Sequence, residues 1–229
     1  MIDVIVISYN RPDETRATIK ALLKANDDIN VTLIDNASKD RHNLKPKERL
    51  TIINLCKNLG QAGAVNLGLD ISKSQYVCFM HNDLVINDKN WIKKAVDFLK
   101  QNDGGLVDVY GYSLIDGAMK RITSLKGHEE QKPIIPIDDF TEVMRTDEMA
   151  NIFKNDGVRA DTRFDMTCCG IWIEQLAKGK KLYVIKLEDA THFRTHSEYK
   201  DKKEADRQYW LRRNIRIRKL KEAGIDYII

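Results

Sequence analysis

The sequence has few of the residues that mark disordered, crosslinked or membrane-spanning chains. Its 229 residues include only 4 prolines and 12 glycines, and 42% of them are hydrophobic, which excludes a disordered chain. The apolar runs, such as residues 4–7 and 76–80, fall far short of the roughly 20 residues that a membrane helix needs. The 4 cysteines show no C-x-x-C spacing, so a zinc site or a disulfide framework is disfavoured.

The charge distribution bears on location and partners. Residues 2–7 already have the pattern of a strand and do not form a signal peptide, so we expect a cytoplasmic protein. The net charge is only +4, yet residues 178–221 hold 15 Lys and Arg against 6 Asp and Glu. Such a block is either a solvated helix face or a docking surface for an anionic partner, so peripheral contact with a membrane stays open.

Strand and helix patterns alternate over the first 115 residues. The strands that we predict are residues 2–9, 29–38, 49–55, 75–80 and 105–115, and the helices are 10–26, 60–73 and 87–105. We expect Asn87 or Asp88 to cap the last of these helices and Gly104 to stop it. This alternation predicts an α/β, Rossmann-like fold, with a mixed, mostly parallel sheet flanked by helices.

The second half is less regular. Residues 116–165 show no clear period and are expected to form loops. A helix over 171–177, a strand over 181–187 and a long basic helix over 198–223 complete the prediction.

Polar side chains follow four successive predicted strands. They are Ser8, Tyr9 and Asn10; Asp35, Asn36 and Ser38; Asn58 and Gly60; and His81, Asn82 and Asp83. Turn chemistry also places such residues after strands. Ligands of parallel sheets bind at the carboxyl ends of the strands, however, so the set together predicts a polar rim of nucleotide size.

The known phosphate-binding loops are missing. There is no G-x-x-x-x-G-K-[ST], and Gly60, Gly63 and Gly68 do not fit G-x-G-x-x-G, so a Walker ATPase and a standard dehydrogenase are disfavoured. Without such a loop, a divalent cation held by Asp83 would neutralise a diphosphate through hard oxygen ligands.

The order of these motifs resembles a known family. "VISYNRPDETRATIKALL", "VTLIDNASKD" and "NLGQAGAVNLGLDISKSQYVCFMHNDLVI", followed by "THFRTHSEY" and "YWLRRNIRIRK", are similar to family 2 glycosyltransferases of the GT-A fold. The likeness covers about 115 residues continuously and the last 50 in pieces. It implies one GT-A domain over 1–229, with a nucleotide-sugar-binding half at 1–115 and an acceptor half with a basic C-terminal helix at 116–229.

The resemblance assigns roles to the strand-end residues. Asp35 would bind the nucleotide base, uracil in the commonest case, beside Ser8, Tyr9, Asn10 and Asn36. Gly60 would let the backbone approach the nucleoside, while Asn58 and Asn66 fix its loop and Asn82 lines the donor site. Asp83 would hold Mn²⁺ or Mg²⁺, and His192, with His196 as an alternative, would complete the metal shell. His81 stands where the family usually has Asp or Asn.

The resemblance implies inverting transfer of a sugar from a nucleotide-diphosphate donor, with a UDP-sugar favoured, to a hydroxyl group. This chemistry needs a carboxylate base. Cys168 to Gly170 occupy the place of the usual acidic pair. We expect Asp165 to be the base, with Asp161 behind it, while Glu174 lies inside the predicted helix.

The acceptor is expected to be a polysaccharide or a lipid-linked glycan. Arg212, Arg213, Arg216 and Lys219 lie near one face of the basic helix and are candidate contacts for an anionic acceptor. Three alternatives remain: a phage-type DNA glycosyltransferase acting on hydroxylated bases, a non-catalytic nucleotide-sugar binder, and a sugar-nucleotide pyrophosphorylase. The last is disfavoured because "SYNRPDE" lacks the glycines of that enzyme's loop.

Overall fold

A seven-stranded sheet forms the centre of the protein. The computed structural model describes residues 1–102, 104–108, 111–115, 118–121, 136–139, 141–155, 175, 178–185 and 187–193. Strand order across the sheet is β11-β6-β10-β4-β1-β2-β3. These strands are β1 (Ile2–Ser8), β2 (Ile29–Asp35), β3 (Leu50–Asn54), β4 (Tyr76–His81), β6 (Gly104–Asp108), β10 (Thr141–Arg145) and β11 (Lys181–Val184).

The predicted mixed, mostly parallel sheet is confirmed. β1 pairs in parallel with β2 and β4, β2 with β3, and β6 with β11, whereas β10 runs antiparallel to both of its neighbours. The β-branched runs become strands because both faces of the sheet are covered, so that consecutive residues such as Val4, Ile5 and Val6 are all fully buried.

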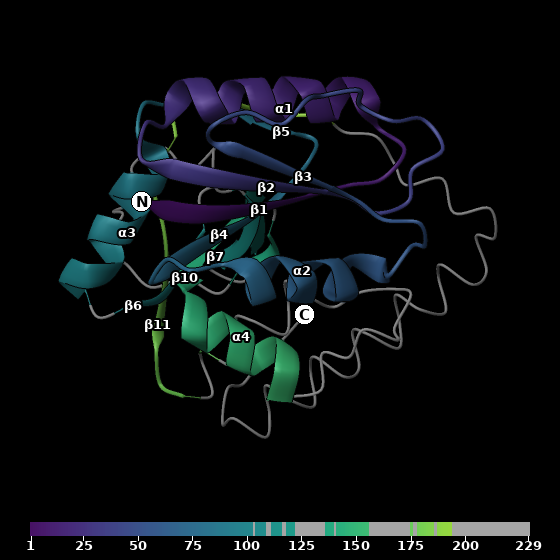
Figure 1. Ribbon diagram of the computed structural model, residues 1–229. Helices are drawn as coiled ribbons and strands as arrows, with labels where there is room; N and C mark the ends of the chain where they lie inside the picture. The colour runs from purple at the N-terminus through teal and green to yellow at the C-terminus, as the bar shows by residue number, and fades with distance from the viewer. Residues whose placement is uncertain are drawn as a thin grey trace.

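Helices cover the two faces of the sheet (Figure 1). α1 (Pro12–Ala25) and α3 (Trp91–Asn102) bury residues such as Leu22 and Trp91 in the cluster on one face. α2 (Gly60–Ile71) and α4 (Thr146–Asn155) pack Val65 and Met149 into the cluster on the other face. β1 alternates between the clusters, with Val4 and Val6 in the first and Ile5 in the second. The period of two along each strand thus builds two cores on one sheet.

The expectation of loops throughout residues 116–165 is wrong. β10 lies there and pairs with both β4 and β6 in the middle of the sheet, and α4 follows it directly. Two further strands, β8 (Ala118–Arg121) and β9 (Pro136–Asp139), flank β7 (Gly111–Ile115) in a separate sheet. The single strand predicted over 105–115 is therefore two strands, β6 and β7, in different sheets.

The predicted start of the third helix is wrong, whereas the helix does end before Gly104 as predicted. α3 begins at Trp91, after Asn90 with φ of 53°, and it ends at Asn102, while Gly104 opens β6. Asp88 does not cap it: its carboxylate accepts the main-chain amides of Glu188 and Asp189 at 3.0 and 2.8 Å. Asp88 thus ties the loop before α3 to the segment that leads into β12.

A small ladder joins two distant segments. β5 (Leu84–Ile86), which follows β4 almost at once, pairs antiparallel with β12 (Ala190–His192). Of the predicted helix at 171–177, only Gln175 is described, in helical conformation, and the basic helix at 198–223 lies outside the described residues. Within the described part of the chain, no helix is both long and apolar enough to cross a bilayer.

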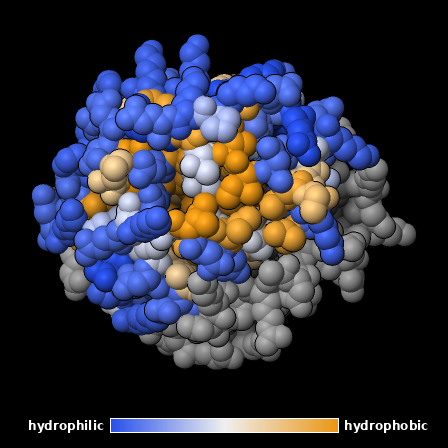
Figure 2. All heavy atoms as spheres, viewed as in Figure 1, coloured by the Kyte–Doolittle hydropathy of each residue, from blue (hydrophilic) through white to orange (hydrophobic). Residues whose placement is uncertain are grey.

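Apolar side chains gather in the middle of the face shown in Figure 2. In the matching view of Figure 1, this region lies over β3 and α2. β3 is the last strand of the sheet, and its Ile52 and Ile53 are only partly buried, as is Leu67 of α2.

Candidate functional site

The carboxyl ends of β1, β2 and β4 meet at one edge of the sheet. In the parallel ladders Ser8 lies beside Asp35, and Ile7 lies beside His81. The polar residues that follow these strands are therefore neighbours in space, as the sequence predicts.

A hydroxyl network fixes the end of β1. The Ser8 and Thr15 hydroxyls are 2.8 Å apart, Thr15 donates to the carbonyl of Arg11 at 2.6 Å, and the Asn82 amide donates to the Thr15 oxygen at 2.9 Å. Because the single Thr15 proton goes to Arg11, Ser8 must donate to Thr15. Ser8 and Asn82 thus join β1 and β4 to the first turn of α1. Their predicted contact with a sugar donor stays a prediction.

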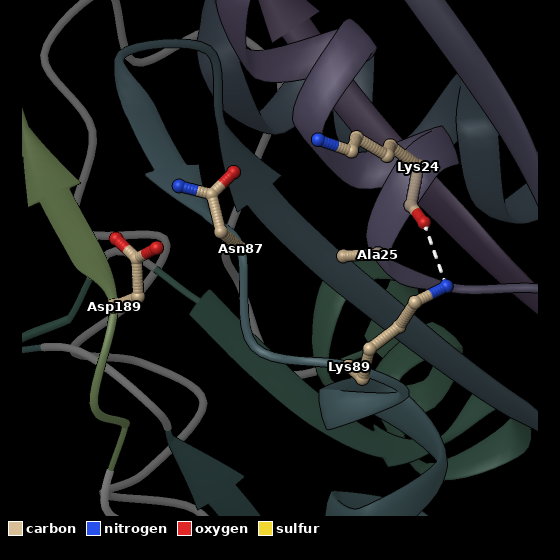
Figure 3. Close-up of a pocket in the computed structure, with 5 residues that line it drawn as sticks. All are labelled: Lys24, Ala25, Asn87, Lys89 and Asp189. Atoms are coloured by element: carbon tan, nitrogen blue, oxygen red, sulfur yellow. Dashed lines mark hydrogen bonds between the residues drawn. The ribbon is translucent and has the colours of Figure 1, made fainter.

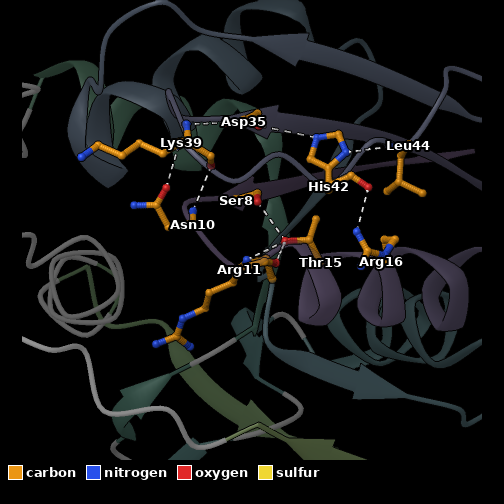
Figure 4. A network of polar contacts seen from close by, with 11 residues as sticks. Ser8, Asn10, Arg11, Thr15, Arg16, Asp35, Lys39, His42 and Leu44 are labelled. Atoms are coloured by element: carbon orange, nitrogen blue, oxygen red, sulfur yellow. Dashed lines mark hydrogen bonds and ion pairs between the residues drawn. The ribbon is translucent and has the colours of Figure 1, made fainter.

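Two exposed residues follow this network. Tyr9 is 48% exposed, and Asn10 adopts a left-handed φ of 52°, which Asn tolerates better than most residues. The main-chain N–H of Asn10 donates to the Ser38 hydroxyl at 2.9 Å. The side-chain oxygen of Asn10 accepts the main-chain N–H of Lys39 at 2.8 Å (Figure 4). Asn10 therefore holds together the loops after β1 and β2, and Tyr9 is presented beside it.

Asp35 is buried at the end of β2. One carboxylate oxygen accepts the Ser38 amide at 2.7 Å, and the other lies 3.8 Å from Nε2 of His42 (Figure 4). Only 1% of Asp35 is exposed, and its Oδ2 has no hydrogen-bond partner among the described residues. A buried acceptor without a donor is costly, and the ring nitrogen of His42 faces this oxygen without reaching hydrogen-bond distance.

His42 is a neutral partner of Asp35. Nδ1 of His42 accepts the Leu44 amide at 3.0 Å, so Nε2 carries the proton and faces the carboxylate. Burial lowers the pKa of His42 below its ordinary 6.5, against the opposing attraction of Asp35, and the charges of Arg16 and Arg41 lower this pKa further. The sequence did not indicate His42, which lies in the loop after β2.

Asn36 braces the start of α2. Its side-chain amide donates to Oδ1 of Asn58 and to the carbonyl of Gly60, both at 3.1 Å, and its oxygen accepts the Leu59 amide at 2.8 Å. Asn58 also accepts the Gly60 amide at 2.8 Å, and Gly60 has φ of 73°, which favours glycine. Asn36, Asn58 and Gly60 thus form one unit, the Asn36 brace, that fixes the backbone at the rim.

Asn66 lies apart from this brace. It belongs to the middle of α2, and its side-chain oxygen is buried without a hydrogen-bond partner in the described part of the chain. Among the described residues, therefore, no hydrogen bond is seen by which Asn66 fixes the loop.

Asp83 forms an ion pair with Arg11. Nη1 of Arg11 donates to Oδ2 of Asp83 at 2.7 Å, with side-chain exposures of 23% and 12%. Arg11 follows β1 and precedes α1, while Asp83 lies between β4 and β5, so the pair crosses the rim. The sequence did not single out Arg11, although Arg11 directly follows the strand-end residues Ser8 to Asn10 and therefore lies at the same edge as Asp83.

The segment that contains His192 runs beside Asp83. His192 pairs with Leu84 in the β5–β12 ladder, and the Phe193 amide donates to the Asp83 carbonyl at 2.8 Å. His81 is the last residue of β4. Its Nε2 lies 3.4 Å from the side-chain nitrogen of Gln61, and its ring centroid lies 5.6 Å from the ring centroid of Phe79. The structure thus brings the backbones of the two predicted metal ligands together.

Asp83 is the residue at this edge whose chemistry suits a divalent cation. Asp83 offers hard carboxylate oxygen, which Mn²⁺ and Mg²⁺ prefer, and it already attracts a cationic group, the Arg11 guanidinium. Among the described residues no group of three or more His, Cys, Asp or Glu is placed to hold a metal. A cation here would take its remaining ligands from a bound diphosphate and water, as Mg²⁺ usually does.

Several predicted residues fall outside the described part of the chain. They are the expected base Asp165, with Asp161 and Glu174, the second histidine His196, and the acceptor candidates Arg212, Arg213, Arg216 and Lys219.

A cavity of about 280 Å³ lies elsewhere. Its lining residues are Lys24, Ala25, Asn87, Lys89 and Asp189 (Figure 3). It is at the other end of β5 from Asp83, and Lys89 there donates to the Lys24 carbonyl at 3.1 Å, near the end of α1. The strand ends that carry the rim do not contribute to it.

Comparison with known families assigns the chain. The family described as Glycosyl transferase family 2 matches residues 3–159, which cover the whole rim from β1 to β5. The chain belongs to glycosyltransferase family 2. No curated protein matches it.

Solved structures show the same fold. S. aureus TarS 1-349 in complex with UDP-GlcNAc has a TM-score of 0.63 at 15% identity, over 98% of this chain and 68% of that one. S. aureus TarS 1-349 alone has a TM-score of 0.54 at 16% identity, over 82% of this chain. The family 2 chain described here spans 59% of that structure and 36% of a longer S. aureus TarS structure. The predicted GT-A fold is confirmed by this likeness.

Proposed function

We propose that the chain transfers a sugar from a nucleotide-diphosphate donor, most favourably a UDP-sugar, to a hydroxyl acceptor, with a divalent cation on Asp83. The observation that carries the proposal is the rim itself. The loops after β1, β2, β3 and β4 are tied to one another by the Asn10–Ser38 bond, the Asn36 brace and the Arg11–Asp83 pair. Such cross-linked strand ends provide a pre-organised binding surface.

The donor half of this proposal rests on the rim residues. The Asp35 carboxylate, at the end of β2 beside Ser8, would accept the imide N–H of a base such as uracil, and the UDP-GlcNAc complex of TarS supports a uridine nucleotide. Tyr9 follows Ser8, which pairs with Asp35, and its exposed ring would offer an apolar face to the base. The cation would stabilise the charge that develops on the departing diphosphate.

The acceptor half rests on the sequence. Inverting transfer with Asp165 as the base, and a polysaccharide or lipid-linked acceptor, remain our proposals for the second half of the chain. DNA as the acceptor and a purely binding role are the alternatives, and a single domain over 1–229 is part of the same proposal.

Donor binding is the first test. Thermal unfolding should be measured with UDP-, GDP- and TDP-sugars, each with Mn²⁺ and with EDTA, because a ligand that binds the folded state raises the melting temperature. We expect a UDP-sugar with Mn²⁺ to give the largest rise. If no nucleotide sugar shifts the transition under either condition, the proposed function is wrong.

Transfer is the second test. Release of UDP should be followed with and without acceptors, namely a lipid-linked glycan, a polysaccharide and hydroxymethylated DNA. Turnover that requires one of these acceptors identifies the acceptor class. Tight donor binding with neither transfer nor slow hydrolysis of the donor would instead support the alternative of a non-catalytic nucleotide-sugar-binding protein.

A further inference from the structure

We propose that Arg11 is a resident counter-cation of Asp83, which exchanges this carboxylate for the donor diphosphate when the divalent metal binds. The inference rests on the proposed function and deepens it. It assigns Arg11 as a diphosphate-binding residue and makes metal and nucleotide binding strongly coupled.

The geometry shows why the metal and Arg11 compete. Nη1 of Arg11 donates to Oδ2 of Asp83 at 2.7 Å, a charge-assisted hydrogen bond at a partly buried position. A metal ion on the same carboxylate would place a second cation within a few ångströms of the guanidinium, and like charges at this range repel strongly where water is scarce. The metal therefore needs either Arg11 to leave or an anion to arrive.

Charge balance indicates that both happen together. The charges of Arg11 and Asp83 offset each other within the pair, so a divalent cation alone adds uncompensated positive charge next to it and a diphosphate alone adds uncompensated negative charge. A divalent cation and a diphosphate arriving together cancel each other, and the freed guanidinium can bind phosphate oxygens in its preferred forked geometry.

The backbone around Arg11 allows this exchange without unfolding of α1. The Arg11 carbonyl accepts both the amide and the hydroxyl of Thr15, at 3.0 and 2.6 Å, which fixes the main chain at the start of the helix. The guanidinium itself is 23% exposed and reaches the rim on a flexible stem. The movement of the charge is therefore a side-chain movement, with the main chain at the start of α1 held in place.

The experiment compares wild type with Arg11→Gln, Arg11→Lys and Arg145→Gln. Arg145 pairs with Asp147 at 2.8 Å and lies beside Tyr76, the first residue of β4, so its variant makes the same change of net charge at the opposite end of that strand. Mn²⁺ affinity is measured by electron paramagnetic resonance without nucleotide and with saturating UDP, and UDP affinity is measured with Mn²⁺.

In wild type we expect Mn²⁺ to bind weakly alone and much more tightly with UDP. Arg11→Gln should tighten Mn²⁺ binding without nucleotide about tenfold and weaken UDP binding with Mn²⁺ about tenfold, the scale of one charge-assisted bond. Arg11→Lys should keep most of the wild-type behaviour, and Arg145→Gln should match wild type.

Three results would overturn the exchange. In the first, Arg11→Gln leaves nucleotide-free Mn²⁺ binding unchanged or weaker. In the second, wild type binds UDP equally well with Mn²⁺ and with EDTA, and Arg11→Gln does not bind UDP, which would mean that Arg11 binds the diphosphate without a metal. In the third, Arg145→Gln has the same effect as Arg11→Gln. Failure of wild type to bind UDP with or without Mn²⁺ would instead contradict the proposed function.

Discussion

The main-chain amide of Phe193 donates a hydrogen bond to the main-chain carbonyl of Asp83, at 2.8 Å. The bond extends the β5–β12 ladder, in which His192 pairs with Leu84. A segment far along the chain is thereby fixed beside the carboxylate that follows β4. This placement gives the expected metal role of His192 a structural basis, because the two residues come together through backbone pairing alone.

Replacement of His192 tests that role. If His192 is a metal ligand, His192→Ala should weaken Mn²⁺ binding in the presence of UDP about tenfold or more, since metal sites are sensitive to each ligand. Thr191→Ala is the control, because Thr191 is an exposed neighbour in the same strand. Isothermal titration of Mn²⁺ into the UDP complex measures both, and equal affinities for the two variants would remove His192 from the shell.

Asp83→Asn removes the charge at the rim with little change in shape. We expect the Mn²⁺-dependent rise in melting temperature with a UDP-sugar to disappear and kcat to fall about a hundredfold or more, the usual scale for loss of one electrostatic contact to the reacting groups. Asp147→Asn is the matched control. Its carboxylate pairs with Arg145 beside Tyr76, at the opposite end of β4 from the rim, so this variant should keep the ligand response.

The sequence predicted which strand ends meet at this edge, because that arrangement depends on local signals. Strands buried on both faces are continuous β-branched runs, and the residues after them, from Ser8 to Asp83, are placed at one edge by parallel pairing alone. It could not predict Arg11–Asp83 or Asp35–His42, since both depend on side-chain conformations of loop residues that have no periodic pattern.

Asn36→Ala tests whether the Asn36 brace is needed for binding. The change leaves the Leu59 amide and the Gly60 carbonyl without their partner, so we expect a loss of about 1–3 kcal/mol in the free energy of unfolding. The rim backbone should also loosen, and the KM for the donor should rise about tenfold with a smaller change in kcat.

Asn30→Ala is its control in the same strand, where Asn30 makes one long bond of 3.4 Å to Asp3 at the far end of β2. Urea unfolding and steady-state kinetics give the two quantities. An equal change of the donor KM in Asn36→Ala and Asn30→Ala would show that the Asn36 brace is not needed for donor binding.

The sequence also failed to predict β10 in the middle of the sheet, for a different reason. The strand is only five residues long, "TEVMR", and includes Glu142, which is fully buried beside Phe79. Short strands with a charged residue resemble loops. The antiparallel insertion of β10 between β4 and β6 depends on partners more than sixty residues away in β4 and more than thirty residues away in β6. Local pattern carries no information about such pairing.

Gly68 allows α2 to pack closely on β1. A Cβ atom at this position would lie 2.7–2.9 Å from three side-chain atoms of Ile5, which is itself fully buried. We expect Gly68→Ala to lower the free energy of unfolding by about 1–3 kcal/mol through overpacking. In the double variant with Ile5→Ala the atoms that clash are gone, so the two losses should be less than additive. Additive losses in urea unfolding would show that helix propensity or strain elsewhere sets the cost.

The burial of His42 predicts a pH dependence of stability. Its pKa lies below the ordinary value of 6.5, mainly because burial disfavours the charged ring. Below about pH 6.5 the unfolded chain therefore binds a proton at this residue that the folded chain does not, so the free energy of unfolding falls as the pH falls and is unaffected by His42 above that range. Replacing the ring with an amide removes this titration and retains a hydrogen-bond donor near Asp35. Urea unfolding at pH 7.5 and pH 5.5 should consequently show a larger loss for wild type than for His42→Gln. Identical losses would mean that the ring gains its proton in the folded state as easily as in the unfolded one, and that Nδ1 is not held by the Leu44 amide.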